Sequence, residues 1–220
     1  MALLRSSDLR LTFGRTVALA GVDVSIGAGE VVAVLGPSGS GKSSLLYCLS
    51  GVLRPDAGEV WFRNERIDNA SSDTRALLRR RSFGFVMQFG LLVPELSLLE
   101  NVALPLRLEG RSRADANTVA ADWIGRLGIG HLARMRPGEV SGGEMQRAAV
   151  ARSLIHSPEV VFGDEPTGSL DSANGRIVLD LLADQARRLG AAVMIVTHDR
   201  DVSAIADRVL LVADGHVTEG

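Results

Sequence analysis

The sequence predicts an α/β fold with a mainly parallel sheet, and two observations support this prediction. Short apolar runs that suit buried strands alternate with longer segments of helical periodicity. A glycine-rich octapeptide, residues 36–43, lies between one such run and one such segment. Its sequence, GPSGSGKS, fits the phosphate-loop pattern G-x-x-x-x-G-K-[ST]. The loop therefore belongs to the sheet itself, where a strand passes into a helix.

The first ninety residues combine this loop with a small group of other strands. Residues 9–13, 22–26 and 58–62 read as strands and predict a β-rich edge. The Val-rich run 30–35 predicts a buried strand leading into the loop, and apolar residues at helical spacing continue to Gly51. This order predicts a P-loop NTPase core with an antiparallel β edge subdomain.

The rest of the chain divides into a helical part and a second α/β part. Residues 91–157 show mainly helical periodicity and predict an inserted helical lobe. Strand-like runs return afterwards, with a helix over 173–189 whose inward face would carry Ile177, Val178, Leu181 and Leu182. We therefore expect one domain over residues 1–220, with a nucleotide-binding core from 1–90 and 158–220 and a helical lobe from about 91–157.

Composition excludes several classes of protein. The chain has 220 residues, 46% of them hydrophobic, and a net charge of −2, which gives no electrostatic footprint for nucleic acid. The single cysteine, Cys48, excludes an internal disulfide, and no apolar run reaches the ~18 residues of a membrane span. The first residues lack the apolar segment of a signal peptide, so we expect a soluble, cytosolic chain.

Lys42, inside the glycine loop, is the only lysine of the chain. A lysine ammonium is a compact point charge on a flexible stem, whereas arginine is a planar fork, so the two are not interchangeable. Genome composition can account for the use of arginine elsewhere, but it does not account for the position of the one lysine. We expect Lys42 to reach between phosphate groups.

Two acids, Asp164 and Glu165, follow the apolar run 160–162. In enzymes with a phosphate loop, an Asp at this place holds Mg²⁺ together with the loop hydroxyl, here that of Ser43. Glu165 would face away from Asp164 in an extended chain and would be free to orient or deprotonate an attacking water. The alternative is an exposed acidic turn, which the phosphate loop upstream makes the weaker interpretation.

His198 follows another predicted strand, residues 191–196. The carboxyl end of a parallel strand is where ligands bind in open α/β sheets, so His198 could contact a γ-phosphate. The alternative is a histidine at the start of a helix that Asp199 caps. The local sequence alone favours this alternative.

Residues 141–144, Ser-Gly-Gly-Glu, match the capping box S-x-x-E at the start of a predicted helix. Capping explains Ser141 and Glu144, but not Gly142 and Gly143, since each glycine in a helix costs about 1 kcal/mol relative to alanine. Something is expected to approach this backbone closely, and the helix dipole favours an anion. The anion would be another ligand or a nucleotide held by a second copy of the chain.

In this order, the motifs resemble those of the ATP-binding cassette subunits of ABC transporters, over essentially all 220 residues. Phe13 is similar to the aromatic residue that stacks on adenine, Gln88 to the Q-loop glutamine, and residues 140–144 to the signature LSGGQ. Residues 169–171 resemble the D-loop, and His198 the switch histidine. The nucleotide-binding residues that the resemblance implies are Phe13, Gly36, Pro37, Ser38, Gly39, Ser40, Gly41, Lys42, Ser43, Ser44, Gln88, Ser141, Gly142, Gly143 and Glu144.

The resemblance also implies a reaction, ATP hydrolysis with Mg²⁺, and a set of partners. The implied catalytic residues are Glu165, His198 and Lys42, and the implied magnesium ligands are Ser43, Gln88 and Asp164. Two copies would form a head-to-tail homodimer, with each ATP between the phosphate loop of one and the signature of the other. A separate membrane permease would dock near Gln88 and the helical lobe. The chain would then lie in the cytoplasm, on the inner face of the membrane.

Details of the motifs refine this resemblance. Residues 100–106 and 166–171 look like those of lipoprotein-releasing and macrolide-export transporters. Val140 and Glu144 depart from the usual signature without touching groups that bind Mg²⁺ or activate water, so hydrolysis is expected to be intact. The alternative is a cassette that relays force to a cell-division or cell-envelope regulator. A DNA-repair or ribosome-associated cassette is disfavoured because a long coiled-coil insertion and a basic surface are lacking.

Overall fold

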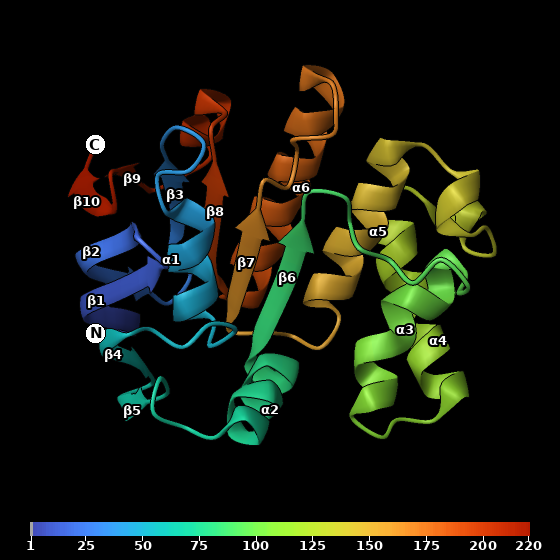
Figure 1. Ribbon diagram of the computed structural model, residues 1–220. Coiled ribbons are helices and arrows are strands. Elements are labelled where there is room, and N and C mark those ends of the chain that lie inside the picture. Colours follow the sequence, from blue (N-terminus) through green and yellow to red (C-terminus); the bar gives the residue numbers. More distant parts are fainter. Residues whose placement is uncertain (1) are drawn as a thin grey trace.

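The computed structural model describes residues 2–220, apart from the side chain of Arg200. Its larger sheet consists of β3 (Val31–Leu35), β6 (Phe83–Met87), β7 (Val160–Asp164), β8 (Ala192–Thr197), β9 (Arg208–Ala213) and β10 (His216–Glu219). The strands lie in the order β10-β9-β3-β8-β7-β6. All neighbouring pairs are parallel except β9 with β10, so the predicted mainly parallel sheet is confirmed (Figure 1).

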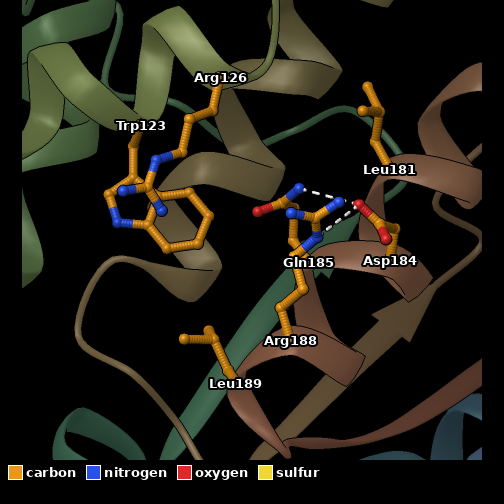
Figure 2. A pocket seen from close by; sticks show the side chains of 7 residues that line it. All are labelled: Trp123, Arg126, Leu181, Asp184, Gln185, Arg188 and Leu189. Atoms are coloured by element: carbon orange, nitrogen blue, oxygen red, sulfur yellow. Dashed lines mark hydrogen bonds and ion pairs between the residues drawn. The ribbon is translucent and has the colours of Figure 1, made fainter.

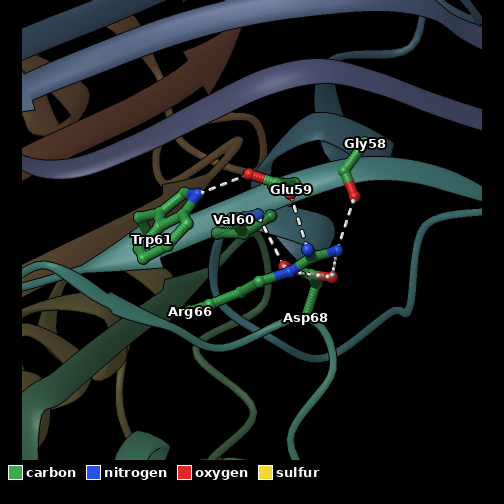
Figure 3. A network of polar contacts seen from close by, with 6 residues as sticks. All are labelled: Gly58, Glu59, Val60, Trp61, Arg66 and Asp68. Atoms are coloured by element: carbon green, nitrogen blue, oxygen red, sulfur yellow. Dashed lines mark hydrogen bonds and ion pairs between the residues drawn. The ribbon is translucent and has the colours of Figure 1, made fainter.

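A smaller antiparallel sheet contains β1 (Ala2–Phe13), β2 (Thr16–Gly27), β4 (Ala57–Phe62) and β5 (Glu65–Arg66). A polar network ties β4 to β5 at its edge (Figure 3). Arg66 pairs with Glu59 at 2.6 Å and with Asp68 at 2.9 Å, and Asp68 also accepts a hydrogen bond from the backbone N–H of Val60 at 2.8 Å. The short strand β5 is therefore held by ion pairs as well as by its backbone ladder, and the predicted antiparallel edge is confirmed.

The helices are α1 (Lys42–Leu49), α2 (Ser72–Ser82), α3 (Leu98–Leu108), α4 (Arg113–Arg126), α5 (Gly142–Leu154) and α6 (Ser172–Leu189), with the 3₁₀ turns η1 (Gly130–Leu132), η2 (Pro137–Glu139) and η3 (Arg200–Ala204). Helices α3, α4 and α5 stand together at one side of the larger sheet (Figure 1). None of the helices within residues 2–220 is both long enough and apolar enough to cross a lipid bilayer.

Two cores lie on opposite faces of the larger sheet. Successive side chains of a strand point to opposite faces, so β3 contributes Val32 and Val34 to one core and Val31 and Ala33 to the other. The first core includes residues of α1 and of the smaller sheet, and the second includes residues of α3 to α6. Burial on both faces explains why this strand has no polar alternation.

Helix α6 follows its prediction except on one face. Its end at Gly190, which adopts a left-handed φ of 69°, agrees with the sequence. Val178 and Leu182 are buried and Leu181 partly so, but Ile177 is 48% exposed, so the expectation that it faces inward is wrong. Each residue of a helix turns the side-chain direction by about 100°, and the buried face here is centred past Val178 rather than on Ile177.

The helical lobe meets the core helix α6 at a groove of about 560 Å³ (Figure 2). Helix α4 contributes Trp123 and Arg126, whose guanidinium carbon lies 5.5 Å from the centre of the Trp123 ring. Helix α6 contributes Asp184, which accepts hydrogen bonds from Gln185 and Arg188. None of the predicted site residues lines this groove.

Candidate nucleotide-binding site

The phosphate loop owes its shape to two glycines. A Cβ at Gly36 would lie 2.2 Å from the carbonyl oxygen of Val212, and one at Gly41 would lie 2.2 Å from that of Ala18. Gly41 also has a φ of 107°, a conformation that other residues rarely adopt. The loop is therefore seated between β9 and β2, at the carboxyl end of β3.

Lys42 closes this loop from inside. It is only 6% exposed, and its Nζ donates to the carbonyl oxygens of Gly36 and Pro37, both at 2.8 Å. A lysine ammonium has three donors, so one N–H remains for another acceptor. The hydroxyl of Ser40 is buried and has no hydrogen-bond partner within the described part of the chain. The loop thus keeps donors that suit a phosphate group.

Asp164, the last residue of β7, is held on both oxygens by α1. The Ser43 hydroxyl donates to Oδ1 at 2.9 Å, and the Tyr47 hydroxyl donates to Oδ2 at 2.6 Å. Burial and the neighbouring Asp164 raise the pKa of Tyr47 to about 12, so the phenol keeps its proton. A hydroxyl and a carboxylate oxygen side by side are ligands that Mg²⁺ accepts, so this pair fits the ion.

Glu165 points to the neighbouring strand β8. Its backbone is not extended, as the sequence argument assumed, but left-handed with a φ of 47°. Thr197 donates to Oε2 at 2.8 Å, and Nδ1 of His198 lies 3.0 Å from Oε1. A left-handed glutamate is uncommon and has to be stabilised by its surroundings. The turn directs Asp164 and Glu165 to different partners, as predicted, by a different backbone geometry.

The two interpretations of His198 turn out to be compatible. The carboxylate of Asp199 accepts a hydrogen bond from the backbone N–H of Asp201 at 2.9 Å and so caps η3. His198 itself is exposed and contacts Glu165 through Nδ1. The cap is therefore Asp199, while the imidazole of His198 belongs to the group of side chains around Glu165.

Gln88 and the two acids border one cleft of about 250 Å³. The cleft is lined by Ser43, Tyr47, Met87, Gln88, Phe89, Leu91, Asp164 and Glu165. Gln88 follows β6, and its carbonyl oxygen accepts from the Ser169 hydroxyl at 2.9 Å. The structure thus brings together four predicted site residues from three segments that are far apart in the sequence.

Phe13 lies at the end of β1, where it pairs with Thr16 across the hairpin to β2. Its side chain is 54% exposed although it is aromatic. Strand β2 is the strand whose Ala18 touches Gly41 of the phosphate loop. The hairpin therefore presents an uncovered aromatic ring on the element that borders the loop.

The signature segment lies at the start of α5 and is absent from the cleft lining. The predicted capping box is present, because the Ser141 N–H donates to Glu144 Oε2 at 2.8 Å and the Glu144 N–H donates to Ser141 Oγ at 3.4 Å. A Cβ at Gly142 would lie 3.3 Å from Leu170 Cδ2, and one at Gly143 would lie 3.3 Å from Asn174 Oδ1. Packing within the chain therefore already accounts for part of the glycine requirement.

Two further polar residues of α5 hold the segment after β6, and the sequence reasoning missed both. Gln146, only 1% exposed, donates to the carbonyl oxygens of Met87 and Pro166 at 2.8 and 2.7 Å. Arg152 donates to those of Gly90 and Leu91 at 2.7 and 2.8 Å. For Gln146, the available signal was a glutamine on the inward face of an otherwise apolar helical stripe.

The sequence profile of the ABC transporter family matches residues 19–168. A lipoprotein-releasing system ATP-binding protein, LolD of Psychrobacter arcticus, is 40% identical over 220 residues, which cover 98% of this chain and 97% of LolD. A second such protein, LolD 2 of Caulobacter vibrioides, is 44% identical over 199 residues, 90% of this chain and 87% of the relative.

Solved structures of bacterial cassettes have the same fold. The dimeric ABC transporter cassette MJ0796 superimposes with a TM-score of 0.90 at 33% identity, over 99% of this chain and 97% of that chain. A second structure of MJ0796, a dimeric post-hydrolysis state bound to ADP and Pi, also gives a TM-score of 0.90, at 32% identity. The chain therefore belongs to the ABC transporter family, as one of its ATP-binding cassettes, and it is an ATPase.

Proposed function

We propose that two copies of this chain close on two ATP molecules and thereby drive a separate membrane permease that releases lipoproteins. The observation that carries the proposal is the cleft in which Ser43, Gln88, Asp164 and Glu165 meet while the signature segment stays outside it. The names of the LolD relatives support lipoprotein release, and the dimeric MJ0796 cassette supports pairing. The permease would keep the chain on the cytoplasmic face of the membrane.

In this proposal the phosphate loop and β7 hold the triphosphate. Lys42 directs its remaining N–H to the phosphates, and the amides at the start of α1 add donors. Ser43 and Asp164, with Gln88 from the facing segment, would hold Mg²⁺, which neutralises phosphate charge when it is bound. Phe13 would stack on the adenine ring with its exposed face.

Glu165 is the base in the proposed reaction. Thr197 and His198 hold its two oxygens, so the carboxylate is fixed where it can orient a water and accept its proton. Because Nδ1 of His198 faces Glu165, Nε2 of the same ring is left for the γ-phosphate. The left-handed backbone of Glu165 is the local strain that this arrangement requires.

The signature contributes the second half of each site. The first turn of α5 presents a helix N-terminus, which suits an anion. The Ser141 hydroxyl, which donates to Glu144 at 2.7 Å within the chain, would turn to the anion in the closed dimer. Since this segment does not border the cleft of its own chain, the nucleotide it contacts would be held by the second copy. ATP binding and dimer closure are then separate steps that use separate residues.

The permease would dock in a groove of about 380 Å³ between the core and the lobe. Apolar side chains from β6 and α3 line it, including Phe85, Leu104 and Leu108, and Arg80 and Arg152 add positive charge. This combination suits a short amphipathic segment that carries an acidic residue. Arg152 also donates to the backbone just after Gln88, so an occupant of the groove would touch the same element as the cleft.

Replacement of the base by Glu165→Gln tests the pairing. The variant is expected to retain ATP and to run as a dimer in size-exclusion chromatography with light scattering, because closure would occur without hydrolysis. The double variant Glu165→Gln, Ser141→Arg is the control, and it is expected to retain ATP as a monomer. A Glu165→Gln protein that neither retains ATP nor dimerises would contradict the proposal.

Purification of the chain together with the permease tests the docking. Co-expression with a lipoprotein-release type membrane permease from the same organism should give a complex that survives detergent extraction. Leu108→Glu places a negative charge in the groove, which would repel a carboxylate of the partner. The variant is expected to lose the permease and to bind ATP as the wild type does. A complex that tolerates this change would place the docking elsewhere.

A further inference from the structure

Helix α1 reaches Asp164 with two hydroxyl groups rather than one. Ser43 and Tyr47 are four residues apart, so they stand on the same face of the helix. Ser43 holds Oδ1 at 2.9 Å and Tyr47 holds Oδ2 at 2.6 Å. The carboxylate therefore has one oxygen beside the predicted magnesium ligand Ser43 and one oxygen occupied by the phenol.

We propose that Tyr47 is a positioning residue that determines the metal preference of this ATPase, by leaving Asp164 a single oxygen for the ion. The inference rests on the proposed function, in which Ser43 and Asp164 hold Mg²⁺. A carboxylate turns easily about its terminal torsion, which has broad minima. The short contact from Tyr47 limits this rotation and keeps Oδ1 directed at Ser43.

The ion that gains from this restraint is a small one. Mg²⁺ requires nearly ideal octahedral geometry and takes one oxygen from a carboxylate, whereas Ca²⁺ accepts irregular geometry and two oxygens of the same carboxylate. With Oδ2 occupied by a hydroxyl donor, Asp164 is prevented from binding an ion through both oxygens. Tyr47 therefore selects against the larger ion without touching either.

The aromatic ring of Tyr47 has a separate role in packing. The ring is partly buried against the core that contains α1 and the smaller sheet, and it borders the cleft beside Gln88. Phenylalanine keeps that ring and removes only the oxygen, so Tyr47→Phe isolates the hydroxyl. Partners of this kind, one shell away from a metal, change metal affinity by about 10- to 100-fold when they are removed.

The test measures binding of a non-hydrolysable ATP analogue by calorimetry, as a function of Mg²⁺ or Ca²⁺ concentration. For Tyr47→Phe, the Mg²⁺ concentration at half-maximal effect is expected to rise about 10-fold. The Ca²⁺ dependence is expected to stay or to become tighter, so the preference for Mg²⁺ over Ca²⁺ narrows. Binding of the analogue in EDTA should stay at the wild-type value, and thermal unfolding should show that the variant remains folded.

A matched control is available at the neighbouring acid. Thr197 donates to Glu165 at 2.8 Å, as Tyr47 does to Asp164, so Thr197→Val removes a hydroxyl of the same kind. It is expected to slow ATP hydrolysis and to leave both metal dependences unchanged. If the ratio of Mg²⁺ to Ca²⁺ dependence in Tyr47→Phe equals that of the wild type, or if Thr197→Val changes it equally, the inference is wrong.

Failure of the inference can be told from failure of the proposed function. A wild-type chain whose analogue binding ignores Mg²⁺ would refute the magnesium site itself, and with it the role of Tyr47. A wild-type chain with normal Mg²⁺ dependence and a Tyr47→Phe variant that matches it would refute only the role of Tyr47. A variant that loses analogue affinity in EDTA as well would show that the hydroxyl shapes the phosphate loop, which also overturns the inference.

Discussion

The two halves of the proposed ATP site are built in different ways. The core half is a group of buried or partly buried side chains. Lys42 donates to the loop carbonyls of Gly36 and Pro37 at 2.8 Å, and Ser43 donates to Asp164 at 2.9 Å. The signature half lies at the exposed start of α5, where Ser141 is bonded mainly to Glu144 of its own capping box. In the proposed site, the core half lies within one chain, whereas the signature half would meet a nucleotide held by the second copy.

The halves are nevertheless joined by a polar clamp, which consists of Gln146 and Arg152 on α5. Their four hydrogen bonds run to backbone carbonyls beside the cleft, from Met87 to Pro166. Helix α5 carries the signature at its start and this clamp further along. We therefore expect a displacement of the segment after β6 to be transmitted to the signature through α5. Whether the two halves nevertheless act as separate sites can be tested.

The largest effect is expected from separating the halves in trans. Lys42→Ala should abolish ATP binding, and Ser141→Arg should spare much of it in the monomer but block closure. Each variant alone should have almost no ATPase activity, since no complete site can form. In a mixture, half of the sites in each mixed dimer pair an intact phosphate loop with an intact signature, so activity should return.

Steady-state ATPase assays over a range of mixing ratios give the readout. Activity should peak near equal amounts, because mixed dimers are then most abundant. If mixing restores nothing, or if Ser141→Arg weakens ATP binding by the monomer as much as Lys42→Ala does, then the site is not divided between chains.

The contrast between regions also separates what was predicted from what was not. The loop, the strands and the two acids were predicted because local signals specify them: Val-rich runs, glycines at fixed spacing and acids after a strand. Tyr47 and Arg152 were missed because their partners lie far along the chain. Asp164 is 117 residues from Tyr47, and Leu91 and Gly90 are at least 61 residues from Arg152. Spacing along the sequence carries no information about such contacts.

Backbone geometry set a second limit on prediction. Glu165 was expected to point away from Asp164 because successive side chains of a strand point to opposite faces. The strand ends at Asp164, however, and the backbone of Glu165 has a left-handed conformation. Glutamate has no special preference for that conformation, so the sequence contains no signal for it. Tertiary contacts to Val196, Thr197 and His198 determine it instead.

The hydrogen bonds of the buried clamp residue Gln146 are expected to contribute more to the free energy of unfolding than those of residues with exposed partners. Gln146→Met keeps the size of the side chain but removes both hydrogen bonds. The carbonyl oxygen of Pro166 then loses the donor of Gln146, whereas that of Met87 keeps the N–H of Gly90 at 2.9 Å. A buried group left unpaired costs about 1–3 kcal/mol, so the free energy of unfolding should fall by about that amount. Urea denaturation followed by circular dichroism measures the change.

Gln185→Met provides the matched control for the clamp. Gln185 is also a buried glutamine on a helix, but its amide donates to the exposed carboxylate of Asp184. Gln185→Met should lose less free energy of unfolding than Gln146→Met, because the carboxylate of Asp184 can form a hydrogen bond with water instead. Equal losses for the two variants would mean that the hydrogen bonds of Gln146 have no special weight.

A smaller effect is expected at the adenine end of the core half. Stacking on an aromatic ring contributes about 1–3 kcal/mol per base, so Phe13→Ala should weaken ATP binding by the monomer about 10-fold. Phe13→Tyr keeps the stacking face and should bind like the wild type. Fluorescence titration of the isolated chain gives both affinities, and unchanged binding by Phe13→Ala would remove Phe13 from the site.

The smallest effect concerns His156, which lies where α5 leaves the lobe and meets β6. Its Nε2 lies 3.0 Å from the carbonyl oxygen of Phe83, and Nδ1 is buried without a partner in the described residues. Burial lowers the pKa of His156 below its usual 6.5, although the Phe83 carbonyl and Glu109 act in the opposite direction. The folded chain therefore favours the neutral imidazole.

The sign of the resulting pH dependence follows from proton binding. Well above pH 6.5 neither state binds the proton, so His156 leaves stability independent of pH. Below pH 6.5, down to the lowered pKa, the unfolded chain binds more protons than the folded one, and stability falls with pH. His156→Gln keeps a donor for Phe83 and does not titrate, so its free energy of unfolding should fall less between pH 7.5 and 5.5. His216→Gln, on exposed β10, controls for the loss of a histidine as such. Equal acid sensitivity in the wild type and both variants would show that the junction between lobe and core does not exclude the charged ring.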